Sequence, residues 1–586
     1  MKRKYLLIFL ILILGFVLRV WNTNYAPPGL NRDEAAIGYN AYSILRTGKD
    51  EYGKFLPLSF KSFGDWKLPF YIYLDVIPVK LFSLTPFSVR LPSIFLGTAT
   101  ILTVYFLVKE LLRNKRKSDI IALLSAFFIS ISPWHIHFSR VAAEANVAVF
   151  FVVLGLYFFI KGIKTPIYLL YSSTSFGLSM YTYHGNHVFT PLLLLALFVY
   201  ILKSHRGLKT VFMFILPVFL LGSVVFANTL LGADRTKISG LTPLSDVSLV
   251  YQKVALPRFD HTNPYSKLTL AYHNKITFLI GRFLQGYYMG FSPEFLFIKG
   301  GNNLQHNIPD FGNLYMWDAP FFLLGLFYIL RDRLRWRYIL LFWLLISPVA
   351  AAITKDAPHS ARMIAFLPLP YILSAVGFLV LSKSIRKRVL QDIFLFGSGV
   401  LLIINFTFYL DRYFIHFPKL LEAQWGGGYK QLVEDVDSLS PRYKNIVIDN
   451  PDNSPYIYFL FYKRTDPKLY QKNVVRYPTD IEGFQNVKSF GGITYKKIDW
   501  ADDLVIPNRL LISWVDSTPA GATGSAVLVT NKLLSHVEEK FGGRNFNLAV
   551  GDKVTSKILK TIRLKNGISQ FYILDIERTP AALINK

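Results

Sequence analysis

The sequence contains no cysteine. This absence excludes a disulfide framework, a thiolate nucleophile and zinc sites built on cysteine. Charged side chains are also scarce, because they make up 17% of the 586 residues, whereas 52% are hydrophobic and 16% are aromatic. A soluble chain of this length needs more polar surface, so the composition predicts a polytopic membrane protein.

Apolar runs of roughly membrane-spanning length recur along the first two-thirds of the chain. They lie near 5–20, 69–84, 89–111, 120–138, 142–160, 166–183, 188–202, 210–231, 315–330, 338–353, 362–382 and 389–410. Basic residues outnumber acidic ones, and the formal net charge is +28. The Lys and Arg residues gather between these runs, at 2–4, 109–117, 161–164, 203–209, 331–337 and 383–388. This distribution fits the positive-inside rule better than it fits the basic face of a nucleic-acid-binding protein, so we expect no nucleic-acid partner.

The run at 69–84 is the weakest candidate for a span. It is interrupted by Pro78 and carries Asp75 and Lys80. If every run crossed the membrane, the basic segment 109–117 and all later basic segments would lie outside. We therefore expect about eleven transmembrane helices, with 69–84 as a helix that lies in or re-enters the outer interface.

This topology places the N-terminus in the cytoplasm of a plasma-membrane protein and the outer loops 21–88 and 232–314 outside. The first run reads as an uncleaved span, since Arg19-Val20-Trp21 lacks the small residues of a cleavage site. After about residue 412, strand-like runs at 445–449 and 570–575 mix with a helical stretch at 428–438. The expected fold is a polytopic α-helical membrane domain at 1–411 followed by a soluble extracytoplasmic α/β domain at 412–586, with a glycine hinge at 426–428.

An acidic pair, Asp33-Glu34, follows the first apolar run on the outer side. The spacing of apolar residues between 37 and 45 predicts an interfacial helix. Asn31 is a suitable N-cap, and Glu34 three residues later completes a capping-box pattern, which favours a structural role for Glu34. Asp33 is not needed for that pattern. Both carboxylates are candidate catalytic residues, and Asp33 is the preferred general base.

Two further motifs follow the acidic pair. Gly64-Asp65-Trp66-Lys67-Leu68-Pro69 places an acid and a lysine before the interfacial helix, although Lys67 could equally extend toward lipid headgroups. Val89-Arg90-Leu91-Pro92-Ser93 opens the next span. Together with Asp33-Glu34, these motifs resemble the GT-C membrane glycosyltransferases of the protein O-mannosyltransferase and lipid A aminoarabinose transferase type.

The resemblance covers residues 1 to about 412 and implies an inverting glycosyltransferase of the cell envelope. It implies that a sugar passes from a polyprenyl-phosphate carrier to a lipid, glycan or protein acceptor on the outer face. Asp33 takes the catalytic acidic position, and Lys67, with Asp65 beside it, helps to hold the donor. The sequence departs from the family at Lys67-Leu68-Pro69, where Lys-Pro-Pro is common. Independently, no nucleotide-phosphate loop is evident, which favours a lipid donor whose phosphate meets cations at the outer bilayer edge.

Further outer turns supply candidate substrate-binding side chains. Arg140 and Glu144 begin a span, where the family has an acid, but they also form a plain i,i+4 pair. Tyr183, His184 and His187 share one turn, in which aromatic residues are ordinary at a membrane interface.

Two candidates lie later in the chain. His306 belongs to Asn302-Asn303-Leu304-Gln305-His306-Asn307, which is rich in amides suited to sugar hydroxyls and equally suited to a solvated loop. Arg362 lies at the mouth of a span, where its guanidinium suits a phosphate.

Three alternatives stay open at this point. The histidines show no tight ligand spacing such as His-Glu-x-x-His, so no cofactor is assigned, while a divalent metal held by the acids stays an alternative. A transporter or flippase would carry ionisable groups near the bilayer midplane and often inverted repeats. A sensor or binding protein that uses the C-terminal domain would not need polar clusters in several outer turns.

Overall fold

The apolar runs of the first 412 residues form helices in the computed structural model. The model describes residues 2–63, 66–113, 117–204, 207–231, 240–332, 335–480, 484–524, 526–540 and 548–584. The helices up to residue 231 are α1 (Lys2–Val20), α2 (Arg32–Thr47), α3 (Pro69–Phe82), α4 (Pro86–Leu111), α5 (Ser118–Ser130), α6 (Pro133–Ser139), α7 (Glu144–Gly162), α8 (Ile167–Thr182), α9 (Asn186–Lys203) and α10 (Leu208–Leu231). A hairpin with two residues in each strand, β1 (Phe60–Lys61) and β2 (Trp66–Lys67), precedes α3.

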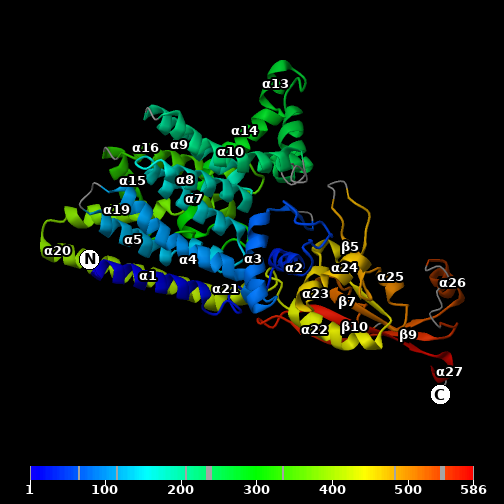
Figure 1. The fold of residues 1–586 in the computed structure, drawn as a ribbon. Coiled ribbons are helices and arrows are strands. Elements are labelled where there is room, and N and C mark those ends of the chain that lie inside the picture. The colour runs from blue at the N-terminus through cyan, green and yellow to red at the C-terminus, as the bar shows by residue number, and fades with distance from the viewer. Residues whose placement is uncertain are drawn as a thin grey trace.

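The second half of the bundle contains both short and long helices. They are α12 (Val247–Val250), α13 (Lys267–Tyr272), α14 (Lys275–Gly290), α15 (Asp318–Arg331), α16 (Arg337–Ile346), α17 (Val349–Ala352), α18 (Ser360–Met363), α19 (Leu369–Ser384), α20 (Arg388–Asp411) and α21 (Phe417–Leu420). Figure 1 shows these helices packed as a bundle, with α13 and α14 projecting from it. A large cluster of buried apolar side chains joins the helices.

Among the described residues, five helical segments are long and apolar enough to cross a membrane: α4, α7, α9, the Leu208–Asn228 part of α10, and Arg388–Leu420. Two bent pairs raise the number to seven, namely α5 with α6, bent by 58°, and Ser360–Phe366 with α19, bent by 50°. The eleven expected spans are not all recovered: α1, α8, α15 and α16 are not among these segments, and α8 and α15 have only 16 and 14 residues. A helix of that length reaches about 21–24 Å, less than the ~30 Å of a bilayer core. Helix α3, with 14 residues and Pro78 inside it, is not among the segments long enough to cross.

The last third of the chain forms a sheet domain. Its mixed eight-stranded sheet has the order β4-β5-β6-β3-β7-β10-β9-β8, in which β3 pairs in parallel with β6 and β7 and the other neighbours are antiparallel. The strands are β3 (Asn445–Ile448), β4 (Val475–Arg476), β5 (Val487–Phe490), β6 (Ile493–Tyr495), β7 (Arg509–Trp514), β8 (Ala526–Leu528), β9 (Lys553–Arg563) and β10 (Ser569–Thr579). The accompanying helices are α22 (Tyr429–Leu439), α23 (Tyr456–Tyr462), α24 (Pro467–Asn473), α25 (Trp500–Asp503), α26 (Asn531–Lys540) and α27 (Ala581–Ile584). The strands expected near 445–449 and 570–575 and the helix expected at 428–438 are confirmed.

The sheet domain shares a hydrophobic core with the segment between α1 and α4. Tyr39 of α2 and Tyr71 of α3 are buried in the same cluster as Tyr456 and Tyr470 of the sheet domain. The Tyr39 hydroxyl donates a hydrogen bond to the Thr465 carbonyl at 3.2 Å. In Figure 1, α2 lies at the end of the bundle against α23 and α24, and α3 lies between α2 and the bundle. The two parts of the chain therefore meet through packed side chains at this end.

The glycine run at 426–428 is a close-packed turn at this junction. Gly426 and Gly428 have φ values of 66° and 81°, a region that favours glycine. A Cβ atom on Gly426 would lie 2.4 Å from the Leu30 carbonyl oxygen. The run therefore holds the beginning of the sheet domain against the segment that leads into α2, which differs from the flexible hinge expected from its composition.

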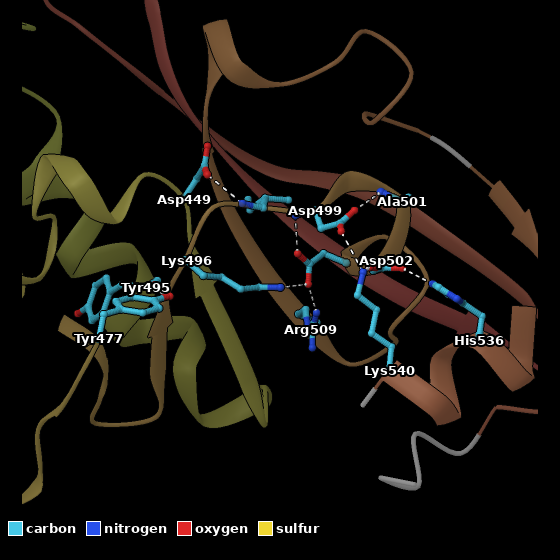
Figure 2. A network of polar contacts seen from close by, with 12 residues as sticks. Asp449, Tyr477, Tyr495, Lys496, Asp499, Ala501, Asp502, Arg509, His536 and Lys540 are labelled. Atoms are coloured by element: carbon cyan, nitrogen blue, oxygen red, sulfur yellow. Dashed lines mark hydrogen bonds and ion pairs between the residues drawn. The ribbon is translucent and has the colours of Figure 1, made fainter. Parts of the chain in front are cut away.

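A network of ion pairs stabilises the part of the sheet domain around α25 and α26 (Figure 2). The buried Asp503 carboxylate accepts from Lys496 at 2.7 Å and from Arg509. Asp502 pairs with His536 at 3.0 Å and with Lys540. Each of these acids therefore faces a cation of a neighbouring segment, which is the arrangement of a structural cluster that joins α25 to β7 and α26.

Candidate active site

The acidic pair lies at the start of α2, and its two carboxylates have different surroundings. Asn31 caps the helix: its side chain accepts from the Glu34 amide at 2.8 Å, and the Glu34 carboxylate accepts from the Asn31 amide at 3.3 Å. The capping box expected from the sequence is confirmed. Glu34 also forms a two-pronged ion pair with Arg90, at 2.8 Å to Nε and 2.7 Å to Nη2. The Ala142 amide donates to the same carboxylate at 2.9 Å.

The Glu34–Arg90 pair is completely enclosed. The side chains are 2% and 0% exposed, so neither can reach a substrate without rearrangement. The remaining Arg90 donors contact the carbonyls of Thr23 and Gly29 at 2.6 and 2.5 Å. Glu34 therefore fixes α2, α4 and the segment before α2 to one another.

Asp33, in contrast to Glu34, is accessible. Its side chain is 48% exposed, and its Oδ1 atom accepts from Lys67 Nζ at 2.8 Å. Lys67 comes from β2, where it pairs with Phe60, and its side chain is only 5% exposed. The hairpin therefore fixes the lysine, which in turn holds the carboxylate of Asp33. Asp65, the other acid of this motif, lies outside the described residues.

The turn between α8 and α9 contacts the same hairpin. His184 Nε2 lies 3.0 Å from the carbonyl oxygen of Trp66, next to Lys67. His187 Nε2 lies 2.9 Å from the Met180 carbonyl, and the rings of the two histidines are 5.2 Å apart. Tyr183 is partly buried and ends α8. This turn therefore supports the β1–β2 hairpin through the contact of His184 with Trp66.

His306 and Arg362 belong to two segments that meet at His359. The His306 ring stacks on Phe138 at 5.7 Å and lies 4.9 Å from the His359 ring. Burial lowers the pKa of His306 to about 4, the Arg362 guanidinium acts in the same direction, and Asp33 and Asp356 oppose it. His306 is therefore neutral at pH 7. His359 connects the other two candidates, because its Nδ1 atom accepts from the Arg362 amide at 3.4 Å while its ring lies against that of His306.

Arg362 is held by its own loop. It donates to the Thr354 hydroxyl at 2.9 Å and pairs with Asp356. Its side chain is 14% exposed.

Arg140 and Glu144 occupy different positions. Arg140 is fully buried and donates to the carbonyls of Leu18, Trp21 and Ala26 at 2.6–2.7 Å. The structure therefore does not bring the Arg140 guanidinium to the accessible face of Asp33. Glu144 is the first residue of α7 and is partly buried.

A cavity of about 480 Å³ lies beside Asp33. One wall comes from Arg32 and Asp33 at the start of α2, and another comes from residues 303–305. The turn at 423–426 and four residues of the sheet domain complete it: Tyr429, Asn453, Tyr458 and Trp514. Its volume falls in the range of ligand-binding sites, about 300–1,000 Å³.

The arrangement offers a carboxylate at a cavity, an almost buried lysine paired with it, and the guanidinium of Arg32 in the same lining. A carboxylate so placed can accept a proton from a hydroxyl that enters the cavity. The cations can stabilise an anionic leaving group. Within the described part of the chain, no group of three or more His, Asp or Glu side chains is arranged to hold a metal ion.

Sequence reasoning missed the contribution of the sheet domain to this cavity. Tyr458 and Trp514 belong to unremarkable aromatic stretches, and only the tertiary packing brings them to Asp33. The amide-rich stretch at 302–307 was the one available signal, and its Asn303 and Gln305 do line the cavity.

Comparisons with known proteins extend these observations. A family model described as dolichyl-phosphate-mannose-protein mannosyltransferase matches residues 67–231, beginning at Lys67. No curated protein matches the sequence significantly. The structure of ArnT from Cupriavidus metallidurans bound to undecaprenyl phosphate superposes with a TM-score of 0.51 and 10% identity, covering 97% of both chains.

The chain has the GT-C fold. The resemblance inferred from the motifs at Asp33, Lys67 and Arg90 is thereby confirmed. The apo oligosaccharyltransferase of Archaeoglobus fulgidus is also similar, with a TM-score of 0.47 and 12% identity over 88% of this chain and 70% of that one. In the structure of that enzyme tethered to an acceptor peptide, the TM-score is 0.44 and the identity is 13%, and this GT-C chain spans 63% of its length.

Proposed function

We propose that the protein is an inverting membrane glycosyltransferase that transfers a sugar from a polyprenyl-phosphate-linked donor to an acceptor on the outer face of the membrane. The observation that carries this proposal is the Asp33–Lys67 pair, whose carboxylate is half exposed beside a cavity while its lysine is almost buried. The family model that begins at Lys67 and the GT-C fold support it. The ArnT structure named above contains undecaprenyl phosphate, a donor-type carrier of the required chemistry.

In the proposed mechanism, the Asp33 carboxylate removes the proton of the acceptor hydroxyl. The acceptor oxygen forms a bond with the anomeric carbon while the bond from that carbon to the phosphate oxygen breaks. The polyprenyl phosphate leaves with the electron pair, and Lys67 and Arg362 are the cations placed to stabilise it. Attack from the face opposite to the leaving group inverts the anomeric centre.

His184 supports the hairpin that carries Lys67 through its contact with Trp66, His187 contacts Met180 in the same turn, and His306 contributes a neutral polar edge. We assign Glu34 a structural role in this scheme because its carboxylate is enclosed with Arg90.

The proposed topology has eleven transmembrane helices in residues 1–411, in which the short helices α8 and α15 cross by local thinning of the bilayer. It places the N-terminus in the cytoplasm and an α/β domain at 412–586 outside. Contacts at the two ends of the bundle support it. Asp119 pairs with Lys4 at 3.1 Å and with Lys109 at 3.2 Å, so basic segments expected in the cytoplasm meet at one end. Asp33 and Lys67 lie with the sheet domain at the other end, where α2 and α3 are drawn in Figure 1.

The proposal is tested with purified full-length protein and a radiolabelled polyprenyl-phosphate sugar. We expect Asp33→Asn to lose at least about 10²-fold in sugar transfer while the protein keeps its folded elution profile, since a positioned general base contributes about 10²–10⁴-fold. The matched control is Asp310→Asn, because Asp310 is an exposed acid of an outer loop that pairs with Arg412 at 3.1 Å. Full activity of Asp33→Asn would overturn the assignment of the base.

A second pair of variants tests the donor site. Lys67→Ala should raise the apparent KM for the donor more than that for the acceptor, because the cation is assigned to the donor phosphate. Lys61→Ala removes a lysine from the paired strand of the same hairpin and serves as the control. Equal changes in the two KM values for Lys67→Ala would contradict the assignment.

A further inference from the structure

The cavity beside Asp33 contains an aromatic surface provided by the sheet domain. The rings of Tyr429 and Tyr458 stack at 3.8 Å with an angle of 11° between their planes. Trp514 lies 6.0 Å from Tyr429, at 78° to it, and its other neighbour is Phe571 at 4.6 Å. Tyr429 and Tyr458 are 3% and 4% exposed, whereas Trp514 is partly exposed. The indole is therefore held by packed rings and still accessible.

The remaining lining is rich in side-chain amides. Asn303 and Gln305 come from the loop before α15, Gln424 comes from the turn after α21, and Asn453 comes from the sheet domain. An amide offers both a donor and an acceptor, which matches neighbouring hydroxyl groups. Arg32 and Asp33 are the charged residues among those that line the cavity in the described structure.

From this combination we infer that the cavity is the acceptor subsite and that the acceptor is a carbohydrate, held against Trp514 with its hydroxyls bonded by the surrounding amides. The inference rests on the proposed function and deepens it by naming the class of acceptor. The C–H face of a sugar ring packs on the negative face of an indole, and side-chain amides bind hydroxyls without requiring charge. An acidic lipid headgroup would call for a cluster of cations, which this lining does not provide.

The position of the cavity suits catalysis. Asp33 both lines the cavity and pairs with Lys67, so a hydroxyl of a bound sugar is presented to the carboxylate on the side away from the lysine. Its proton passes to Asp33, its oxygen bonds to the anomeric carbon of the donor, and polyprenyl phosphate departs. Acceptor and donor thus approach the same carboxylate from two sides.

The walls of the cavity are fixed relative to one another. Gln305 Nε2 donates to the Gln424 carbonyl at 2.9 Å, and the Gln305 carbonyl lies 3.0 Å from His137 Nε2. A Cβ atom on Gly426 would also lie 2.6 Å from the Tyr458 hydroxyl, so the turn contacts the aromatic surface directly. The sheet domain is therefore a part of the active site in this inference, through Trp514, Tyr458 and Asn453.

Binding is tested by saturation-transfer NMR on the full-length protein in detergent, with methyl glycosides of hexoses, N-acetylhexosamines and pentoses as probes. We expect at least one glycoside to bind both the wild type and Asp33→Asn. Trp514→Ala should weaken that binding by about tenfold or more, as for a buried aromatic contact, and Trp514→Phe should restore most of it. The control is Trp500→Ala, because Trp500 packs in a different cluster of the same domain.

Transfer is then measured with the radiolabelled donor and three acceptors: the best-binding glycoside, a serine- and threonine-containing peptide, and lipid vesicles. Transfer to the glycoside, with a raised acceptor KM and an unchanged donor KM in Trp514→Ala, supports the inference. Binding or transfer confined to the peptide or the vesicles, or an acceptor KM that Trp514→Ala leaves unchanged, overturns it. If glycosides bind through Trp514 but the donor is never consumed, the proposed function fails and the sugar-binding site stands.

Discussion

The adjacent carboxylates of Asp33 and Glu34 should respond in opposite ways to loss of charge. Glu34→Gln keeps the length of the side chain and the ability to complete the capping box, since glutamine also serves at that position. It removes the negative charge that faces Arg90 at 2.7–2.8 Å inside the protein. Arg90 then stays buried as an uncompensated cation.

The cost follows from the burial of both partners. Breaking a buried ion pair by removing one partner costs about 3–5 kcal/mol. Asp33→Asn concerns a carboxylate that is 48% exposed, so water can replace part of its contact with the almost buried Lys67 and its loss should cost less than the loss of Glu34. We therefore expect Glu34→Gln to lower the melting temperature of the purified protein clearly, whereas Asp33→Asn should lower it less and abolish transfer.

The double variant Glu34→Gln/Arg90→Met completes the test. Because it removes both charges, it should recover a large part of the stability lost in Glu34→Gln, and the thermodynamic cycle should give a coupling energy of more than about 1 kcal/mol. Thermal unfolding is followed by size-exclusion chromatography of heated samples, with donor consumption measured in parallel. A stable and fully active Glu34→Gln variant, or an Asp33→Asn variant that is equally destabilised, would refute this division of roles.

Three further predictions concern other parts of the molecule. Burial raises the pKa of Glu51 from 4.5 to about 8, so between these pH values the folded state holds a proton that the unfolded state has released. The stability of the fold should therefore decrease as the pH rises from about 5 to 8, and Glu51→Gln should remove this dependence in thermal unfolding. Gly426→Ala should destabilise the protein by more than about 1 kcal/mol because of its positive φ and the contact with Leu30, whereas Gly521→Ala, at an open position, should not. Asp503→Asn should cost about 3 kcal/mol by leaving Lys496 and Arg509 without their buried carboxylate, measured as a loss of thermal stability without loss of donor binding.

Much of the candidate site could be predicted from local patterns. Asn31 and Glu34 are three residues apart, so the capping box is a property of one helical turn, and the structure contains it. Asp33 is not needed for that box, and this was the reason to prefer it as the accessible acid. Its side chain is 48% exposed in the structure. The pairing of Asp33 with Lys67, by contrast, joins residues 34 positions apart through a hairpin that has only two residues in each strand.

The number of transmembrane helices was harder to predict from the sequence, because a crossing depends on the length of a helix as well as on its hydropathy. Helices such as α8 and α15 are apolar and buried against neighbours, yet they are shorter than a bilayer core. A hydropathy pattern reports the apolar environment of a segment, and it does not separate a full crossing from a shorter helix packed inside the bundle.

The sequence by itself determined the class of the protein, the helical bundle followed by an α/β domain, and the identity of the acidic pair, because these follow from composition, hydropathy period and local capping. Only the tertiary structure decided that Arg90 encloses Glu34, that Arg140 is occupied by backbone carbonyls, and that Trp514 and Tyr458 reach the cavity beside Asp33. These outcomes depend on contacts between residues up to several hundred positions apart. Such contacts are set by how α2, α3 and the sheet domain pack together, which no local pattern encodes.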